Sequence, residues 1–476
     1  MPLREATKAW LLIALQSFGG PAGQIAVMQR SLVDERRWIG EHRFLHALSY
    51  CMLLPGPEAT QLAIYVGWLL NGWVGGVVAG VLFVLPGVVA LLALSWAYVA
   101  HGDSAVVSGL FLGLAPAVVA VVVQAVVRIS RRALRHRALV WLAVAAFLLL
   151  AVLGLPFPLV IIGAGAAGWA LGRWWPAVMV RPDLPVEEGE VPPLVPDDAL
   201  HHAAPSARRN VTVLAVGLAL WVAPVALAWM LASGSRTVFT DQGLFFGGMA
   251  LVTFGGAYAV LSYVAQAAVG SFGWLSAGEM VRGLALAEST PGPLIMVVQF
   301  VAFLGAYRHP GSLDPWLAAV LASLLVVWVT FVPCFLFIFL GAPYVERLRE
   351  STTLAAALTG VTAAIVGVIA NLAVYFAVHT LFSRTTTRSV GPVDLVVPVW
   401  SSYVWTSFVV TGLRWCWCSG CAGRCCARSG CARWPASGSR SWADLEGGLA
   451  RTGHGRRRRH DPFWGIPGVR AVLGLS

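Results

Sequence analysis

The sequence predicts an all-α polytopic membrane protein, built from two homologous helical halves that contain discontinuous helices and form an inverted repeat. Three observations lead to this fold class. The 476 residues are 58% hydrophobic and only 12% charged, whereas soluble domains usually carry roughly 25% charged residues. Long apolar runs recur along the chain. Two short motifs also repeat at a constant spacing.

The apolar runs are long enough to enter or cross a hydrocarbon core of about 30 Å. They indicate about eleven to thirteen membrane insertions. The first run has no small-residue cleavage site, so we expect a helix that stays attached rather than a signal peptide. The long runs are 8–28, 77–99, 105–127, 211–231, 243–265, 317–341 and 354–378, and the shorter or broken runs are 44–70, 138–172, 283–306 and 394–413.

The net charge of +11 is concentrated at one end of the chain. Residues 414–476 contain eleven Arg and three acidic residues, so they carry +8 and the rest of the chain only +3. This distribution argues against nucleic acid as a partner. Lys8 is the only lysine, so the chain has no GxxxxGK[ST] phosphate loop. We therefore expect a gradient or a separate subunit to supply energy.

A Pro-rich, acidic stretch divides the membrane body. Residues 181–209 contain no apolar run that could pack or span, which is typical of a linker. The linker separates a first membrane repeat, 1–180, from a second, 210–413. The remaining segment, 414–476, is rich in Arg and Cys.

The two halves repeat each other at an offset of 236 residues. After about eleven inserted residues the match continues, with Pro86 facing Pro333. Each half is therefore predicted to be one copy of an ancestral bundle. The matching motifs are Phe18-Gly19-Gly20 with Phe254-Gly255-Gly256, Trp38 with Trp274, and Pro55-Gly56-Pro57 with Pro291-Gly292-Pro293.

Positive charge changes sides between the halves. Four Arg mark the loop before the first Pro-Gly-Pro motif, whereas the equivalent 266–279 has no Arg or Lys. Conversely, 99–103 has none and its counterpart carries two Arg. An inverted repeat requires this exchange, because cytoplasmic loops are enriched in Lys and Arg. Helix parity leaves the orientation open, because 44–70 and 138–172 could each cross once or fold back as hairpins.

Both repeated motifs should break a helix inside the membrane. Proline lacks an N–H and clashes with the preceding turn. Pro57 and Pro293 suit the first position of a restarted helix, whose unpaired N–H groups carry partial positive charge. With the Gly-Gly pairs, they predict up to four converging N-termini, which bind oxyanions without a buried Arg. Simple kinks are the alternative, but the recurrence of both motifs favours a site.

The candidate substrate-binding residues lie at these breaks. Carboxyl groups are costly within a membrane, so Glu58 and Glu288 suggest a function such as carrying a coupling proton. Glu58 could instead cap its own helix, and Gln24 and Gln61 could simply join helices. The candidates are Gly19, Gly20, Gln24, Pro55, Gly56, Pro57, Glu58, Gln61, Gly255, Gly256, Tyr258, Thr290, Pro291, Gly292 and Pro293.

A charged stretch lies between the first helix and the first Pro-Gly-Pro motif. It contains Arg30, Arg36, Arg37 and Arg43. One interpretation is a solvated loop that anchors topology. The other is an entry funnel that concentrates a dianion at the cytoplasmic mouth.

Six of the eight cysteines lie in the C-terminal segment. Cys418-x-x-Cys421 alone would suggest metal or redox chemistry, but no second pair follows at ligand spacing. The composition also changes abruptly after Leu413. These features favour a frameshift or sequence artefact over a disordered tail or a redox segment, and we predict no metal site and no cofactor. The six are Cys416, Cys418, Cys421, Cys425, Cys426 and Cys431.

Several long motifs, in order and at the right spacing, closely resemble the chromate ion transporter family in its long, two-domain form. The resemblance covers about residues 5–410. In the first half the motifs are Phe18-Gly19-Gly20-Pro21-Ala22-Gly23-Gln24, Glu35-Arg36-Arg37-Trp38-Ile39, Tyr50-Cys51-Met52-Leu53-Leu54-Pro55-Gly56-Pro57-Glu58-Ala59 and Leu82-Phe83-Val84-Leu85-Pro86-Gly87. In the second half they are Thr253-Phe254-Gly255-Gly256-Ala257-Tyr258 and Glu288-Ser289-Thr290-Pro291-Gly292-Pro293.

The resemblance implies a multi-pass carrier of the bacterial inner membrane that exports chromate, confers resistance and is not an enzyme. It also implies that the chromate dianion mimics sulfate. Sulfate or another dianion on the same scaffold is the nearest alternative. A membrane reductase using the Cys cluster is a different class, and a passive channel is disfavoured by the paired broken helices. Residues 414–476 depart from the family, which leads us to expect a last hydrophobic helix there. The number of subunits is left open.

Overall fold

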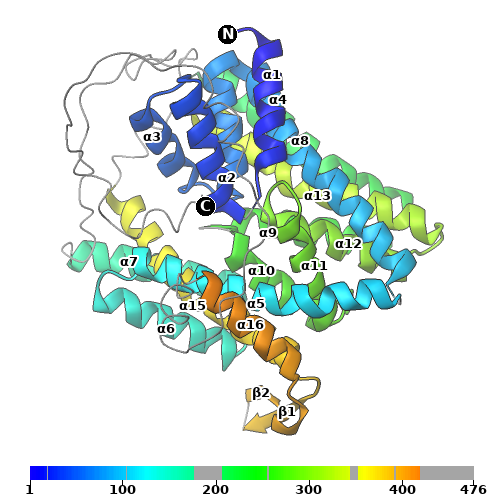
Figure 1. Cartoon of the computed structure of the whole chain (residues 1–476). Coiled ribbons are helices and arrows are strands. Elements are labelled where there is room, and N and C mark those ends of the chain that lie inside the picture. Colours follow the sequence, from blue (N-terminus) through cyan, green and yellow to red (C-terminus); the bar gives the residue numbers. More distant parts are fainter. Residues whose placement is uncertain are drawn as a thin grey trace, which may run out of the picture. The chain divides into compact units, whose positions relative to one another are not determined.

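The computed structural model describes residues 1–18, 20–102, 104–175, 206–254, 257–342, 352–390 and 393–418. The chain forms two compact units, Met1–Thr411 and Gly412–Ser476, and the fold and site below belong to the first. In the described residues this unit is almost entirely helical (Figure 1). The predicted linker 181–209 and the C-terminal segment 414–476 fall mostly outside the described residues.

The first half contains α1 (Leu3–Gln16), α2 (Gly20–Gln29), the π-helical turn η1 (Arg30–Glu35), α3 (Glu41–Cys51), α4 (Glu58–His101), α5 (Ala105–Ala133), α6 (Arg137–Ala151) and α7 (Phe157–Trp174). After the linker follow α8 (Ala207–Leu231), α9 (Val238–Val252), α10 (Ala257–Ala265), the π-helical turn η3 (Gln266–Ser271), α11 (Ala277–Ser289), the 3-10 turn η4 (Leu294–Met296), α12 (Val297–Arg308), α13 (Pro315–Gly341) and α15 (Thr352–Leu381). The hairpin β1 (Thr385–Val390) and β2 (Val393–Pro398), the 3-10 turn η6 (Trp400–Ser402) and α16 (Trp405–Cys418) complete the described chain.

Five of the described helices are long and apolar enough to cross a membrane. They lie in α4, α5, α8, α13 and α15. Where the sequence predicted one further apolar insertion at 394–413, the structure instead has strand β2, a short turn and the start of α16. The β-branched run around Val396 pairs with β1 as a strand, because such residues favour extended structure, and Pro398 ends it.

The backbone repeats itself at the offset found in the sequence. The π-helical turn η1 returns as η3 one repeat later, with Gln266 equivalent to Arg30. The second residue after each turn has a positive φ, 51° at Arg37 and 62° at Gly273. The middle residues of the two Pro-Gly-Pro motifs also agree, with φ of 127° at Gly56 and 108° at Gly292. The two-half organisation is therefore confirmed.

Helix α4 is two helices joined at a sharp reversal. Asn71 and Gly72 have non-helical backbone angles, and this divides α4 into a first arm, residues 58–70, and a second arm, residues 73–101. Gly67 packs against Gly75 and Ala79 across the reversal, so the arms run antiparallel. In the second half, α12 and α13 make the same reversal, since Tyr307 and Phe303 of α12 both pack on Trp316.

The second arm of α4 and its equivalent α13 run antiparallel to each other. Gly76 faces Phe339, and four residues later Gly80 faces Phe335. Equivalent spanning helices that point in opposite directions are what an inverted repeat requires. The structure therefore agrees with the orientation that the charge pattern favoured.

Four further pairs of helices form hairpins that are too short to cross the membrane. α1, for example, has 14 residues, which is about 21 Å against roughly 30 Å of hydrocarbon. Side chains pair across each turn, as Phe245 of α9 does with Tyr263 of α10, and Tyr50 of α3 with Tyr65 of α4. The hairpins are α1–α2, α3 with the first arm of α4, α9–α10 and α11–α12. Segment 44–70 thus folds back rather than crossing once.

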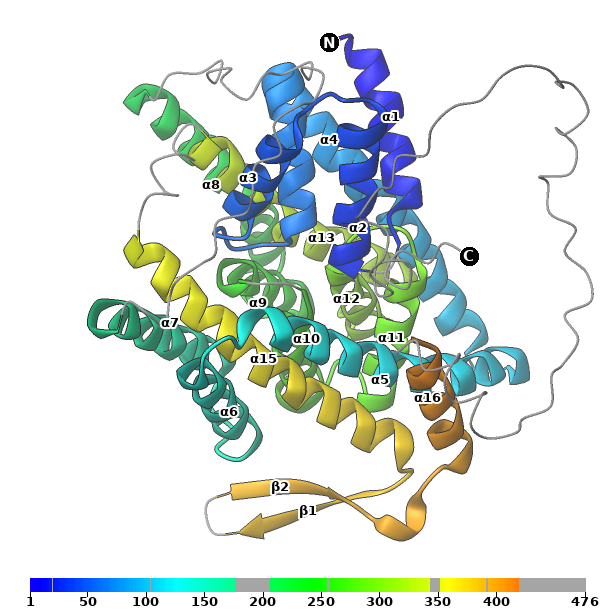
Figure 2. The ribbon, with the colours of Figure 1, turned by 60° about the vertical axis from the view of Figure 1, so that its left-hand side comes forward.

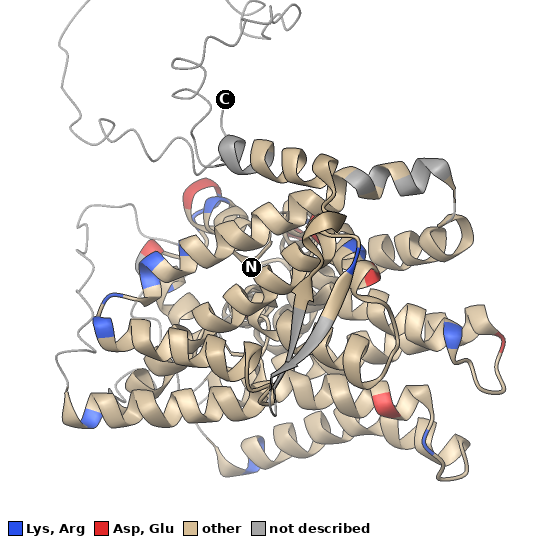
Figure 3. Ribbon diagram, turned by 90° about the horizontal axis from the view of Figure 1, so that it is seen from below, with Lys and Arg blue, Asp and Glu red and all other residues tan. Residues whose placement is uncertain are grey.

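Figure 2 shows α1, α2 and α3 grouped above α9 to α12, with the long helices around them. Lys, Arg, Asp and Glu occupy only a few positions of the described ribbon (Figure 3). This pattern is expected where most of the surface faces lipid. The core therefore consists of apolar side chains, among them the buried Trp10, Phe83, Phe246 and Phe300.

Candidate functional site

The turns of the four short hairpins meet in the middle of the fold. The Gly56 N–H donates to the Thr253 carbonyl oxygen at 2.7 Å, and the Gly292 N–H donates to the Ser17 carbonyl oxygen at 2.9 Å. Thr253 is the repeat equivalent of Ser17, and Gly292 that of Gly56, each 236 residues apart. Each Pro-Gly-Pro turn is thus held by the opposite half, in a reciprocal pair of backbone hydrogen bonds.

Each Pro-Gly-Pro turn also packs against a long helix of the other half, α13 at Gly56 and α4 at Gly292. A Cβ added at Gly56 would lie 3.1 Å from Sγ of Cys334, and one added at Gly292 would lie 3.1 Å from Cα of Gly87. Gly87 and Cys334 each follow the matched helical proline of their half. The two turns are therefore tightly enclosed by the other half as well as bonded to it.

Helix N-termini are presented at these turns, as the sequence predicted. Pro57 precedes the first residue of α4, and Pro293 precedes η4 and α12. Both prolines are the capping residue rather than the first helical residue, one position earlier than predicted, because their ψ values of 107° and 132° are extended. Gly20 begins α2 with φ of 73°. Gly19, Gly255 and Gly256 lie outside the described residues.

The predicted glutamines brace the turns. Buried Gln24 donates through Nε2 to the Gly292 carbonyl oxygen at 2.6 Å, and so links the first half to the second turn. Buried Gln61 donates through Nε2 to the Pro55 carbonyl oxygen at 2.7 Å within its own turn. The hydroxyl of Thr290 donates to the Ala287 carbonyl oxygen at 3.0 Å. In this structure all three side chains donate their hydrogen bonds to backbone carbonyl oxygens.

Tyr258 joins the two Gly-Gly breaks to the second Pro-Gly-Pro turn. Its hydroxyl donates to Oε1 of Glu288 at 3.0 Å. The same hydroxyl would lie 3.6 Å from a Cβ added at Gly20, so it stands at the start of α2.

The first turn of α4 carries a hydroxyl that sequence reasoning missed. Thr60 is fully buried, and within the described residues its Oγ1 has no hydrogen-bond partner. A buried hydroxyl without a partner is unfavourable unless a ligand or water binds it. Glu58 starts the same turn and is half-buried. The sequence could have indicated Thr60, because it lies three residues after the second proline of the motif and so in the first turn of the restarted helix.

Only some of the arginines of the predicted entry loop are exposed and able to attract an anion. Arg30 bonds Oε1 of Glu35 at 2.9 Å, and Arg36 approaches the other carboxylate oxygen at 3.8 Å. Arg43 is buried, whereas Arg37 is exposed. The entry funnel therefore rests mainly on Arg37 and the exposed side of Arg30, and it remains a prediction.

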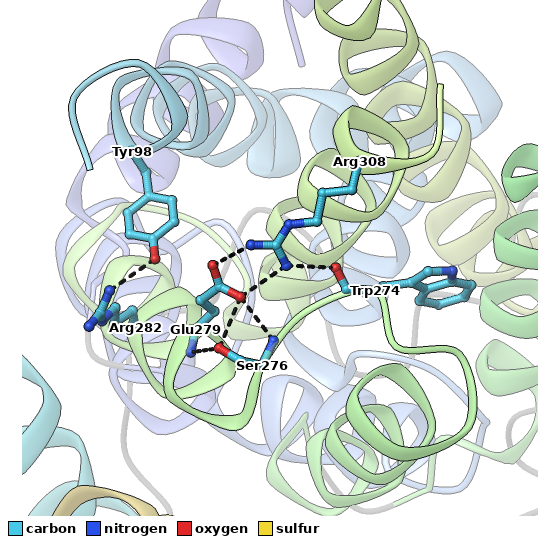
Figure 4. Close-up of polar contacts among 6 residues, drawn as sticks. All are labelled: Tyr98, Trp274, Ser276, Glu279, Arg282 and Arg308. Atoms are coloured by element: carbon cyan, nitrogen blue, oxygen red, sulfur yellow. Dashed lines mark hydrogen bonds and ion pairs between the residues drawn. The ribbon is translucent and has the colours of Figure 1, made fainter. Parts of the chain in front are cut away.

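The second half carries an ion-pair network at the ends of α11 and α12 (Figure 4). Arg308 bonds both oxygens of Glu279, at 2.7 and 3.0 Å, and also the Trp274 carbonyl oxygen. Glu279 accepts a hydrogen bond from the Ser276 N–H at 2.9 Å. Nearby, Arg282 donates to the Tyr98 hydroxyl at 3.1 Å. The network ties the open ends of α11 and α12 together.

Among the described residues no cluster of His, Cys, Asp or Glu could hold a metal ion. Cys416 and Cys418 end α16, and the other four cysteines of the C-terminal cluster lie outside the described residues.

Comparison with known proteins gives a consistent result. The sequence model of the chromate transporter family matches residues 4–169 and 240–423. The chain is 34% identical to a chromate transport protein of Pseudomonas aeruginosa, over 76% of this chain and 77% of the relative. It is 27% identical to a chromate transport protein of Cupriavidus metallidurans, over 80% and 84% of the two chains. No solved structure matches.

Proposed function

The chain belongs to the chromate transporter family, and from that premise we propose that it is a secondary transporter that exports chromate across the bacterial inner membrane and thereby confers resistance. The observation that carries the proposal is the meeting of the broken-helix turns of both halves, held by the reciprocal hydrogen bonds of Gly56 and Gly292. Such turns at a repeat interface are typical of a substrate site in secondary transporters.

The chemistry of the site suits a tetrahedral dianion. The first turns of α2, α4 and α12 offer N–H groups with no partner inside their own helix, together with a partial positive charge. The Thr60 hydroxyl adds a buried donor. Chromate and sulfate share shape and charge, so donors of this kind bind both, and sulfate is the expected competitor.

The membrane potential alone can drive a dianion outward. Each elementary charge gains about 2.3 kcal/mol per 100 mV, so a dianion leaving an interior-negative cell gains about 4.6 kcal/mol. That equals a concentration ratio of about three powers of ten. Export therefore needs no coupled cation, and a proton leaving with the anion would halve the electrical gain.

Glu288 is the best placed group for such a proton. It accepts a hydrogen bond from Tyr258 and directly precedes the second Pro-Gly-Pro turn. An ionised carboxylate here repels the dianion, so we propose that Glu288 is protonated when the anion is bound. Glu58, in the first turn of α4, would act as a helix-start acid rather than as the proton carrier.

The test is uptake of radiolabelled chromate into everted membrane vesicles that contain the full chain. Respiring everted vesicles are positive inside, so an exporter accumulates chromate in them. We expect valinomycin with K⁺, which removes the electrical potential, to abolish accumulation, and excess sulfate to compete. Vesicles without the protein are the control. Absence of accumulation despite verified insertion would overturn the proposal, and insensitivity to valinomycin would exclude the electrical driving force.

A further inference from the structure

Helix α8 stands outside the internal repeat and leaves a groove against it. The family match resumes at residue 240, after α8 has ended. α8 has no buried residue, and it is fixed to α13 by two reciprocal bonds, from Trp221 Nε1 to the Val329 carbonyl oxygen and from Trp328 Nε1 to the Leu220 carbonyl oxygen, at 2.8 and 2.7 Å. Gly217 allows close contact with Leu336 of α13.

Between α8, α13 and the second arm of α4 lies an apolar groove of about 1090 Å³, which we name the α8 groove. On α4 its lining runs from Trp73 to Val88, a length of about 22 Å at 1.5 Å per residue. One leaflet of hydrocarbon is about 15 Å thick. The three lining helices are all candidate spans, so the groove faces the bilayer and has the length of an acyl chain.

One end of the α8 groove is basic. Arg208 and Arg209 line it there, at the start of α8, and among the described lining residues there is no Asp or Glu. Arg209 donates to the Phe339 carbonyl oxygen and lies 5.6 Å above the Trp73 ring, which fixes the cation at the mouth. Arg208 is exposed beside it. The first-turn N–H groups of α8 add partial positive charge at the same place.

We propose that the α8 groove is a binding site for one anionic phospholipid, with its phosphate on Arg208 and Arg209 and its acyl chains along α4 and α13. Basic pockets between transmembrane helices bind anionic headgroups in this way. A zwitterionic lipid suits the mouth less well, because its own cation would face Arg208 and Arg209.

The deep end of the groove reaches the back of the substrate site. The Val88 carbonyl oxygen accepts a hydrogen bond from Gln299 of α12 at 3.0 Å. The preceding residue, Gly87, packs on Gly292 at the second Pro-Gly-Pro turn. A lipid tail in the groove therefore supports the helix against which that turn is packed, and transport should be faster with anionic lipid present.

The test measures lipid binding on the purified full chain by native mass spectrometry, and so does not depend on transport. The probe is palmitoyl-oleoyl phosphatidylglycerol, with the phosphatidylcholine of the same chains for comparison. We expect one retained phosphatidylglycerol per chain. Arg208→Gln with Arg209→Gln should weaken it about 30-fold, from about 1 kcal/mol for each Arg. The matched control, Arg131→Gln with Arg132→Gln at the end of α5, should leave binding unchanged.

A second variant distinguishes lipid binding in the α8 groove from binding to the two arginines alone. Val81 lines the groove and is half exposed, so Val81→Trp should block the acyl chains while keeping both arginines, and should also lower retention at least about tenfold. Equal retention of both lipids, or full retention in Val81→Trp, would overturn the proposal. Displacement of the lipid by inorganic phosphate would also overturn it, because the site would then recognise phosphate alone.

Discussion

The two halves share a backbone and differ in the side chains placed on it. Ser17 and Thr253 both bond back to their own helix, to the Ile13 and Met249 carbonyl oxygens, in addition to receiving the opposite Pro-Gly-Pro N–H. The other polar residues of the site do not repeat. Their equivalents, 236 residues away in the other half, are apolar. Gln24 corresponds to Val260, Gln61 to Val297, Glu58 to Leu294, Tyr258 to Ala22 and Glu288 to Met52.

This difference separates two tasks. The helix ends at the breaks are formed by the backbone, so they can be the same in both halves. They can therefore serve an anion that enters from either side of the membrane. The single carboxyl–phenol pair of Glu288 and Tyr258 belongs to one half only. A proton carried there makes the two directions of the cycle chemically unequal. We therefore expect the symmetric part to bind the anion and the asymmetric part to couple transport to a proton.

The largest expected effect comes from breaking the shared backbone. Gly292→Ala places a methyl group 3.1 Å from the Gly87 backbone at a φ of 108°, where residues other than glycine are strained. Chromate uptake should fall at least about 100-fold, as displaced sites do. Gly56→Ala should be nearly as severe. Gly163→Ala, with nothing within 4 Å and no positive φ, should transport normally in the same vesicles. If Gly292→Ala and Gly56→Ala both transport chromate at the full rate, the Pro-Gly-Pro turns are not part of the substrate site.

The next test removes the asymmetric pair. Glu288→Gln keeps the shape but holds no exchangeable charge, so uptake should drop about tenfold and lose its dependence on a pH gradient. Tyr258→Phe should show a smaller loss with the pH dependence kept. Uptake with and without nigericin measures both effects, and Glu5→Gln, at an exposed position of α1, is the control. If Glu288→Gln responds to nigericin like the parent chain, the proton lies elsewhere.

A smaller difference between the halves concerns stability. Arg308 holds Glu279 with two bonds, whereas the Arg30–Glu35 pair is largely exposed on both sides. A double-mutant cycle should give about 1 kcal/mol for the first pair and near 0.3 kcal/mol for the second. Thermal unfolding of the single and double Gln variants measures both. Equal coupling in the two pairs would contradict the asymmetry.

The pH dependence of that pair has a definite sign. Burial disfavours the Glu279 carboxylate, but hydrogen bonds from Arg308 and Ser276 outweigh burial and lower the pKa of Glu279. The stabilisation is therefore complete above the unfolded pKa of about 4.3 and is lost as the pH falls through the lower folded value. The parent chain should lose stability below about pH 4, and Glu279→Gln should lose less over the same range.

The smallest effect is expected at the entry loop. Arg37 is exposed, and its equivalent in the second half is Gly273. Arg37→Gln should raise the KM for chromate about twofold at low salt, and the difference should vanish near 0.5 M salt because exposed charges are screened. Arg236→Gln, an exposed arginine of the second half, is the control. A salt-independent loss would point to a structural role for Arg37.

Local chemistry explains which features the sequence could predict. Pro-Gly-Pro and Gly-Gly break helices wherever they stand, and the 236-residue offset pairs them, so the broken helices and the two halves were predictable. The hairpins were not, because 44–70 is compatible with one crossing or a return until Tyr50 is seen beside Tyr65. Contacts between distant segments, such as Gln24 with Gly292 or Arg282 with Tyr98, depend on packing and leave no trace in spacing.

The reciprocal bonds of the Pro-Gly-Pro turns also constrain how the protein is made. A first half alone would leave the Gly56 N–H and the Ser17 carbonyl without their partners in hydrocarbon, where each unsatisfied group costs several kcal/mol. The ribosome must therefore synthesise at least as far as Thr253 before the first Pro-Gly-Pro turn can take its final form, and as far as Gly292 before the Ser17 carbonyl finds its partner. Biogenesis ends in one late docking event between two inserted halves.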